Sequence, residues 1–427
     1  MKTSYPKDKI RVVLLENIHP RAADMLAAEG FKVDAHKKAL DGAELIEAIK
    51  DAHVVGIRSG SQVRADVLKA SPRLLSIGCF CIGTNQVDVR TACQAGVPVF
   101  NSPFSNTRSV AELTVAEIVG LHRRLLDKSV QMHSGQWDKS AAGSHEVRGR
   151  TLGIVGYGRI GSQVSVLAEA MGMRVIYFDV MSVLPLGNAR PTRTLDELLG
   201  ASDVVTLHVP ATKSTDRLIG PRQIDKMRDG AYLINNARGS VIDIPALAKA
   251  LTSGKLAGAA LDVFPNEPAV AGETFTSEIR GLANVILTPH VGGSTEEAQE
   301  AIAEDVAGKL AKFINNGSTT TAVNVPQVDL PGQGGSASMD AESAHSSIGE
   351  ERPARRHRIL HFHHNVPGVL SKMHSAIAEM GANIAAEYLQ TNADIGYVVL
   401  DVDPTDAERI TEKLRSIPET VRVRMLW

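Results

Sequence analysis

Several features that mark whole classes of proteins are scarce or missing in this sequence. Its 427 residues include three cysteines, which excludes a disulfide framework and is typical of a reducing compartment. Lysine and arginine total 46 against 48 aspartate and glutamate residues, so a net charge of −2 offers no basic field to nucleic acid or anionic lipid. The first residues lack the apolar core of a signal peptide, and no apolar run reaches the ~20 residues of a membrane span. We expect a cytoplasmic protein without nucleic-acid or membrane partners.

The chain has enough aliphatic residues for large cores, and its length predicts several domains. Hydrophobic residues make up 43% of it. Over the first hundred residues, short β-branched runs alternate with amphipathic helical segments, which predicts a parallel sheet covered by helices. The expected strands are 10–15, 54–57, 74–79 and 97–100, and the expected helices include 20–29 and 43–50.

A second alternating series follows one long helical pattern at 110–130. Its six expected strands match the strand count of a Rossmann-like, doubly wound dinucleotide-binding sheet. Helices such as 161–171 and 244–253 lie between these strands. The strands are 151–155, 174–178, 203–209, 231–234, 257–263 and 284–287.

The C-terminal part of the chain contains a segment of linker-like composition followed by a segment with the pattern of a folded module. Residues 326–351 are rich in glycine and serine and have few large apolar residues, which predicts a flexible linker, because such a segment buries too little surface to become ordered. The element order after it, βαββαβ, predicts a ferredoxin-like module. Its expected strands are 358–363, 383–391, 396–402 and 421–426, and its expected helices are 368–380 and 406–416.

A glycine-rich loop joins the first strand of the second series to its helix. Gly156, Gly158 and Gly161 have the spacing that allows a tight turn, a close approach to a pyrophosphate and close packing of helix on strand. Asp179 ends the next expected strand and can accept hydrogen bonds from ribose hydroxyls. No arginine follows it at 180–182, so NAD is favoured over NADP. The alternative is an ordinary glycine-rich turn and an aspartate that caps a helix.

Arg238, Glu267 and His290 each follow an expected strand of the second series. Because the carboxyl ends of parallel strands meet at one edge, these side chains could converge on one site. A guanidinium can bind a substrate carboxylate, and an imidazole can take a hydroxyl proton as hydride leaves for a nicotinamide. A carboxylate can orient that imidazole. The spacing alone equally allows a surface ion pair and a turn histidine.

These segments resemble the D-isomer-specific 2-hydroxyacid dehydrogenases. The resemblance rests on 152–161, 236–239, 262–268 and 288–295, and it extends from about residue 9 to the C-terminus apart from the linker. It implies that Arg238 orients the substrate, that His290 exchanges the proton and that Glu267 pairs with this histidine. It also implies contacts to NAD from Gly156, Gly158, Arg159, Ile160, Gly161, Asp179, Ala237, Asp262, Gly292 and Gly293.

The same resemblance implies a discontinuous domain plan and a homotetramer joined through the NAD-binding and C-terminal domains. A flavodoxin-like substrate domain would comprise 1–105 and 293–325, and the NAD-binding domain would comprise 106–292. The linker would be 326–355 and a regulatory domain 356–427.

Within the family, residues 77–88 and 104–113 are similar to members that oxidise 3-phospho-D-glycerate to 3-phosphohydroxypyruvate at the start of serine synthesis. This similarity implies phosphate contacts from Lys37, Arg58, Ser59 and Asn106, and an element with Trp137 and Lys139 that reaches a neighbouring subunit's site. Gly60 stands where some relatives have a second arginine, so preference for a phosphorylated substrate rests on fewer cations. The same catalytic residues would serve reduction of 2-oxoglutarate to 2-hydroxyglutarate. An NAD(H)-sensing binding protein of corepressor type is the alternative from another class.

Residues 361–370 and 383–391 resemble the ACT regulatory domain, which binds small amino acids between paired subunits. His363, Asn365 and Asn383 match the effector positions of serine-inhibited relatives, which implies feedback inhibition by L-serine. The competing interpretation is a metal site, since His361 and His363 share a strand face. No nearby cysteine or acidic cluster completes such a site, and we expect no metal.

Overall fold

A computed structural model describes residues 5–268, 272–330 and 356–426. The chain forms two compact units, one from Met1–Pro103 with Glu300–Trp427 and the other from Phe104–Gln299. Of the predicted linker, 331–355 lie outside the described residues. Val328 and Leu330 are buried in the core of the first unit, so the ordered chain continues past the predicted boundary at 326. None of the helices in the described ranges has the length and apolar character needed to cross a membrane.

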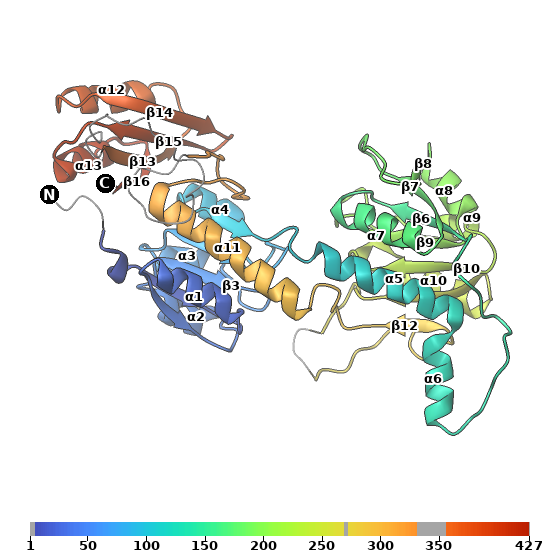
Figure 1. The fold of residues 1–427 in the computed structure, drawn as a ribbon. Coiled ribbons are helices and arrows are strands. Elements are labelled where there is room, and N and C mark those ends of the chain that lie inside the picture. Colours follow the sequence, from blue (N-terminus) through green and yellow to red (C-terminus); the bar gives the residue numbers. More distant parts are fainter. Residues whose placement is uncertain (1–4, 269–271, 331–355, 427) are drawn as a thin grey trace, which may run out of the picture. The chain divides into compact units, whose positions relative to one another are not determined.

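The first unit contains a parallel five-stranded sheet with the order β2-β1-β3-β4-β5. Figure 1 shows this part of the chain in blue, with β3 labelled. The strands are β1 (Arg11–Leu14), β2 (Lys32–Ala35), β3 (Val54–Ile57), β4 (Ser76–Cys79) and β5 (Val99–Asn101). The helices are α1 (Pro20–Ala28), α2 (Gly42–Ile49), α3 (Ala65–Ala70), α4 (Val89–Gln94) and α11 (Glu296–Asn316). Strand β2 was not predicted because its partly exposed residues form no apolar run.

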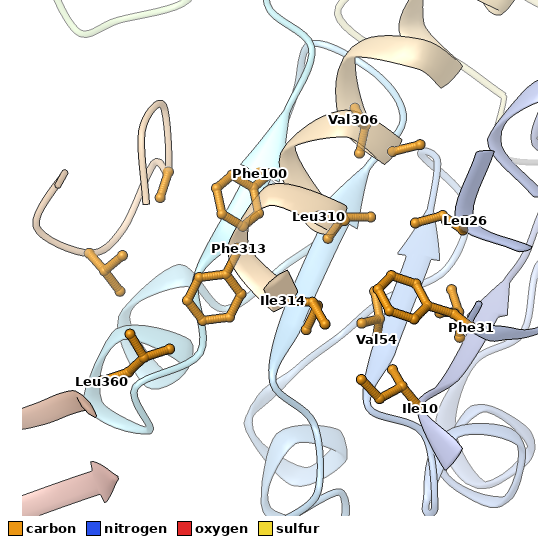
Figure 2. Close-up of a cluster of buried hydrophobic side chains, with 14 of the residues drawn as sticks. Ile10, Leu26, Phe31, Val54, Phe100, Val306, Leu310, Phe313, Ile314 and Leu360 are labelled. Carbon is orange, nitrogen blue, oxygen red and sulfur yellow. The ribbon is translucent and has the colours of Figure 1, made fainter. Parts of the chain in front are cut away.

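Helix α11 returns to the first sheet and closes its core. Val306, Leu310 and Phe313 of this helix are buried against the sheet, and the rings of Phe313 and Phe100 are 6.0 Å apart between centroids (Figure 2). Leu360 of the C-terminal module belongs to the same hydrophobic cluster. The first sheet, its returning helix and the C-terminal module therefore share one core.

The C-terminal module is an antiparallel sheet with the order β14-β15-β13-β16 and two helices, as the sequence predicts. Its elements are β13 (His357–His364), α12 (Val369–Ala378), β14 (Ile384–Thr391), β15 (Ile395–Val402), α13 (Ala407–Arg415) and β16 (Thr420–Leu426). Alternate residues of β13 serve the two faces: Ile359 packs in the cluster with the helices, whereas Leu360 and Phe362 pack in the cluster with the first sheet.

Polar contacts fix this module to the C-terminal end of α11. Arg358 Nη1 donates to the carbonyl of Asn316 over 3.3 Å, and Arg424 donates to the carbonyl of Ile314. The Tyr397 hydroxyl donates to the carbonyl of Gly317 over 2.6 Å. Cations and donors at this end satisfy carbonyl groups that have no partner within the helix.

The second unit is a parallel seven-stranded sheet with the order β12-β11-β10-β9-β6-β7-β8, which confirms the Rossmann-like prediction. Its strands are β6 (Thr151–Val155), β7 (Arg174–Phe178), β8 (Arg190–Pro191), β9 (Val204–Leu207), β10 (Ala231–Asn235), β11 (Leu256–Leu261) and β12 (Val285–Leu287). Its helices are α5 (Thr107–Arg123), α6 (Leu125–His133), α7 (Arg159–Ala170), α8 (Leu195–Ala201), α9 (Pro221–Lys226) and α10 (Ile244–Thr252). The two-residue β8 was too short to predict.

The prediction of one continuous helix over 110–130 is wrong. The chain breaks at Arg124, whose φ of 49° and ψ of 36° are left-handed, and α6 begins at the next residue. Asp127 in the first turn of α6 accepts hydrogen bonds from the backbone N–H of Asn284. This tertiary contact redirects the chain, and no signal for it exists in local periodicity.

Candidate active site

The glycine-rich loop lies between β6 and α7 in the form that the spacing predicts. Gly156 has a φ of +91°, and a Cβ there would lie 2.6 Å from the carbonyl oxygen of His208. A Cβ at Gly161 would lie 2.3 Å from the carbonyl oxygen of Gly156, so only glycine allows this close packing of helix on strand. At Gly158, by contrast, a Cβ would have no atom of the described chain within 4 Å. The middle of the loop is therefore open to an approaching ligand.

Asp179 ties this loop to the end of β7. Its Oδ2 accepts a hydrogen bond from the N–H of Tyr157 over 2.7 Å, and its Oδ1 accepts from the N–H of Met181 over 2.9 Å. Ile160 is half-buried, and the Arg159 guanidinium lies 3.8 Å from the ring centroid of Phe104. The loop and the acidic residue therefore lie together, as a dinucleotide site requires.

His208 adds a polar group at this crevice that the sequence interpretation missed. It follows β9, the neighbour of β6, at the point where the strand order reverses. Its Nε2 is 3.0 Å from the Thr206 hydroxyl, while its buried Nδ1 has no partner in the described part of the chain. Burial lowers the pKa of His208 to about 3, so the ring is neutral. An orphaned nitrogen beside an open glycine loop fits a bound dinucleotide.

The loop with Arg238 is shaped by amide side chains at the end of β10. Asn235 Oδ1 accepts from the N–H of Ala237 over 3.1 Å, and Asn235 Nδ2 donates to the carbonyl of Arg238 over 3.0 Å. The half-buried Arg238 side chain donates through Nη1 to the carbonyl of Ala237 over 2.6 Å. A Cβ at Gly239 would lie 1.9 Å from the carbonyl carbon of Phe264, so this loop packs directly on the segment that leads to Glu267.

Glu267 and His290 form a pair. His290 Nδ1 is 2.8 Å from Glu267 Oε2, and Glu267 Oε1 accepts from the N–H of Phe264 over 3.0 Å. His290 has a φ of +55°, and its N–H donates to the carbonyl of Asp262 over 2.8 Å. Because the carboxylate faces Nδ1, this nitrogen carries the proton and Nε2 is left for a ligand. Such an exposed pair adds little stability, so its effect is to orient the ring.

Asp262 holds the loop that contains His290. Its buried carboxylate accepts from the Thr288 hydroxyl over 2.6 Å and from the N–H groups of Val291 and Gly292 over 2.8 and 2.7 Å. A Cβ at Gly293 would lie 2.2 Å from Asn106 Nδ2, so this loop also packs against the start of α5. These contacts of Asp262 are all within the protein, and its contact with NAD stays a prediction.

The residues predicted to bind a phosphate fall in different units. Arg58 and Ser59 follow β3, and the exposed Lys37 follows β2, all in the first unit, whereas Asn106 and the exposed Lys139 belong to the second. The Arg58–Ser59 loop is held by Glu16, which the sequence interpretation missed. The Glu16 carboxylate accepts from the N–H groups of Arg58, Gly60 and Ser61 over 3.1, 2.7 and 2.9 Å. A Cβ at Gly60 would lie 2.9 Å from that of Ala39, which explains a glycine at this position.

The predicted effector residues are not brought together within one chain. His363 pairs with Gly396 at the start of β15, and Asn365 Nδ2 donates to the nearby carbonyl of Asn392 over 2.8 Å. Asn383 lies beyond the other end of that strand, where its carbonyl accepts from the N–H of Asp403. At about 3.3 Å per residue, these two ends of β15 are roughly 20 Å apart.

Two of the four histidines of β13, His361 and His363, form a buried pair. The rings of His361 and His363 are 5.6 Å apart between centroids, and His361 Nε2 is 2.8 Å from the Thr420 hydroxyl. His363 Nδ1 is 2.8 Å from the carbonyl of His364. Throughout the described ranges, no three His, Cys, Asp or Glu side chains are grouped so that they could hold a metal ion.

Comparison with known proteins adds two family matches. The NAD-binding domain of the D-isomer specific 2-hydroxyacid dehydrogenases matches residues 115–292, and the AHAS small subunit-like ACT domain matches residues 359–422. D-3-phosphoglycerate dehydrogenase of Haemophilus influenzae is 51% identical over 427 residues, covering 100% of this chain and 99% of that protein. The Escherichia coli K12 protein of the same name is 49% identical over 429 residues, covering 100% of both chains.

Solved structures share the fold over about 70% of this chain. D-lactate dehydrogenase from Aquifex aeolicus, crystallised with NAD and lactic acid, has a TM-score of 0.62 at 30% identity and covers 71% of this chain and 95% of its own. The TT0316 protein from Thermus thermophilus has a TM-score of 0.64 at 33% identity and covers 70% of this chain and 96% of its own.

Proposed function

The chain belongs to the D-isomer-specific 2-hydroxyacid dehydrogenases, within them to the D-3-phosphoglycerate dehydrogenases, and we propose that it interconverts 3-phospho-D-glycerate and 3-phosphohydroxypyruvate. Two sets of observations support this activity. Its relatives of that name match over the whole length at 49–51% identity. The His290–Glu267 pair at 2.8 Å, which follows strands of the same parallel sheet as the glycine loop, carries the chemical argument.

In the proposed mechanism, residues of this chain bind and orient the substrate and transfer the proton of its hydroxyl group. The glycine loop, Asp179 and the region of His208 would hold NAD, which would supply the hydride acceptor. Arg238 binds the substrate carboxylate through its guanidinium fork, which fixes the C2 hydrogen and hydroxyl. His290 Nε2 takes the proton of the C2 hydroxyl in oxidation and returns it in reduction. Glu267 keeps the proton of the ring on Nδ1 and stabilises the imidazolium that forms.

Substrate selectivity is assigned to the cations of the first unit. Lys37 and Arg58 are positive groups near the carboxyl ends of β2 and β3, and Glu16 fixes the loop of Arg58 and Ser59. A phosphate dianion suits such cations, and Lys139 and Asn106 complete the proposed set. Because Gly60 supplies no second cation, we include slower reduction of 2-oxoglutarate by the same catalytic residues in the proposal.

The C-terminal module is proposed to bind L-serine between two chains. His363 and Asn365 lie at one end of the sheet and Asn383 at the other, so three-residue recognition needs the opposite end of a second copy. Pairing of these modules, together with pairing of the NAD-binding units, gives the homotetramer that we propose. The three free cysteines suit the cytoplasm, where we place the enzyme.

The test is NADH oxidation by the purified full chain with 3-phosphohydroxypyruvate or 2-oxoglutarate, each with and without L-serine. We expect faster turnover of the phosphorylated substrate and suppression by serine. Turnover of 2-oxoglutarate alone would contradict the substrate assignment. Bound NADH without turnover of either substrate would contradict the enzyme and favour the NAD(H)-sensing alternative. Insensitivity to serine would contradict only the effector assignment.

A further inference from the structure

Glu117 is a carboxyl group inside the second unit that the proposed mechanism does not use. It lies in the middle of α5 and is 3% exposed. Its Oε2 accepts a hydrogen bond from Asn236 Nδ2 over 2.7 Å, and the same amide donates to the Thr114 hydroxyl over 3.0 Å. Helix α5 therefore binds the residue that lies two positions before Arg238.

Two buried oxygens at this contact have no hydrogen-bond partner among the residues that the structure describes. They are Glu117 Oε1 and Asn236 Oδ1, and they belong to two groups that the Nδ2–Oε2 hydrogen bond already joins. Two acceptors cannot satisfy each other. A single proton on the carboxyl satisfies both, because a carboxylic acid and a primary amide form a ring with two hydrogen bonds.

We propose that Glu117 is a protonated positioning residue whose Oε1 hydroxyl donates to Asn236 Oδ1. The resulting ring holds Asn236 by both ends of its amide. It thereby fixes the 236–239 loop and the direction from which Arg238 reaches the substrate. The inference rests on the proposed function only where enzyme activity is the readout, since the proton and the ring are properties of the folded chain.

The surroundings of Glu117 favour the neutral acid. Burial raises the pKa of Glu117 to about 8; the hydrogen bond from Asn236 opposes this effect, and the Asp262 carboxylate at the end of β11 adds to it. The buried residues of two other elements in contact with α5 are uncharged: α7 contributes Gly161, Val164, Ser165 and Ala168, and β12 contributes Ile286. Helix α6 buries none of its side chains.

Ionisation of Glu117 has a predictable effect on both catalytic loops. It breaks the ring to Asn236 and places a second negative charge near Asp262, which holds the loop of His290. We therefore expect catalysis to weaken as the pH rises through about 8. Folding stability should also fall as the pH rises from 4.5 to about 8, because over that range only the unfolded chain has released the proton.

The test compares three variants with the wild-type enzyme. Glu117→Gln keeps the shape of the side chain and supplies an amide that forms the same ring at every pH. The loss of kcat/KM that we expect in the wild-type enzyme, with a midpoint near pH 8, should therefore be absent from this variant. Glu117→Leu removes the ring and should lower kcat/KM at pH 7 by roughly tenfold or more, with NADH affinity unchanged. Glu112→Gln, on the exposed face of the same helix and paired with Arg108, is the matched control and should keep the wild-type profile.

Infrared difference spectra provide a readout that needs no turnover. The wild-type protein at pH 7 should show the C=O stretching band of a protonated carboxylic acid that Glu117→Gln lacks, and the band should titrate away near pH 8. Absence of this band, or an unchanged alkaline limb in Glu117→Gln, would overturn the inference. If the wild-type chain has no activity, the proposed function fails while the band still tests the proton. Should Glu117→Leu not fold, Glu117→Gln carries the test alone.

Discussion

The orientation of one imidazole decides the chemistry of the proposed site. His290 is held by Glu267 at Nδ1 and by the Asp262 carbonyl at its backbone N–H. It adopts a left-handed backbone conformation, which is uncommon for a residue with a side chain. Rigid placement of this kind is typical of groups that must meet a substrate at one atom.

His290→Gln should lower kcat by roughly 10²–10⁴-fold and leave the Kd for NADH unchanged, because it removes the proton acceptor without touching the glycine loop. Stopped-flow turnover and NADH fluorescence titration measure the two quantities. His374→Gln is the matched control, since His374 also pairs with a glutamate, Glu387, over 3.1 Å but lies in the C-terminal module. Equal losses in both variants would contradict a catalytic role for His290.

The fully buried His361 of β13 should make the free energy of unfolding depend on pH in the acid range. Burial, with a further contribution from His363, lowers the pKa of His361 from 6.5 to about 3. Between these two pKa values the imidazole is protonated in the unfolded chain and neutral in the folded chain. The free energy of unfolding therefore falls by about 1.4 kcal/mol per pH unit as the pH drops. His361→Gln, which keeps a group for the Thr420 hydroxyl, should show a shallower dependence in urea unfolding at pH 4–6 than wild type. A slope identical to that of wild type would contradict a neutral His361.

At the scale of elements, strands and helices with complete local patterns could be predicted and those shaped by tertiary contacts could not. Strands β6 and β7 are short and mainly apolar segments of a parallel sheet, and they were predicted to the residue. The break at Arg124 depends on Asp127 binding the backbone at Asn284, more than 150 residues away in sequence. Periodicity within a window cannot contain that information.

The candidate site likewise contains residues that could be predicted from the local pattern and residues that could not. Arg238, Glu267 and His290 follow buried strands, and the edge rule predicted that they would lie near one another. Glu117 and Glu16 were missed because each acts on a loop distant in sequence. A signal for Glu117 does exist: it shares the spacing of Thr114, Ile118 and Leu121 on the buried face of α5, where a carboxylate is out of place.

Two glycines of the loop are expected to differ in role, one serving protein stability and the other NADH binding. Gly161→Ala places a Cβ 2.3 Å from a backbone oxygen, so we expect it to destabilise the protein without ligand by about 1–3 kcal/mol. The added methyl group of Gly158→Ala would point into open space, so the Tm of this variant without ligand should match that of the wild type. Its affinity for NADH should fall sharply, because the methyl group occupies the space left for the ligand. Thermal melts with and without NADH distinguish the two. A lower ligand-free Tm for Gly158→Ala would contradict this division of roles.

At the scale of the whole molecule, one buried arginine pairs with a carboxylate inside the regulatory module and also joins this module to the returning helix. Arg358, with its side chain 2% exposed, donates to both oxygens of Asp401 over 2.7 and 2.8 Å and also reaches the carbonyl of Asn316. Arg358→Met removes the two hydrogen bonds that the nearly buried Asp401 carboxylate accepts. It should lower the free energy of unfolding, measured by chemical denaturation, by about 3–5 kcal/mol. The double variant Arg358→Met/Asp401→Leu should recover much of that loss. A double variant as unstable as the single one would contradict the pair.

A serine site shared between chains predicts complementation. His363→Ala and Asn383→Ala should each abolish serine inhibition, because each removes one residue from every site. A hybrid of the two variants keeps one intact site per pair of modules, so coexpressed chains should regain partial inhibition of NADH oxidation. Insensitive hybrids would contradict a site built from opposite ends of two sheets.

The order of the chain also sets an order of events during synthesis. The second unit is one continuous stretch, Phe104–Gln299, whereas the first sheet lacks the face supplied by α11 until residues beyond Glu300 have been made. At about 5–20 residues per second, the ribosome needs roughly 10–40 s to cross the intervening segment. During that interval Ile10, Val54 and Phe100 lack the cover that α11 supplies. The N-terminal half of the first unit should therefore emerge as a client for chaperones, although it is translated first.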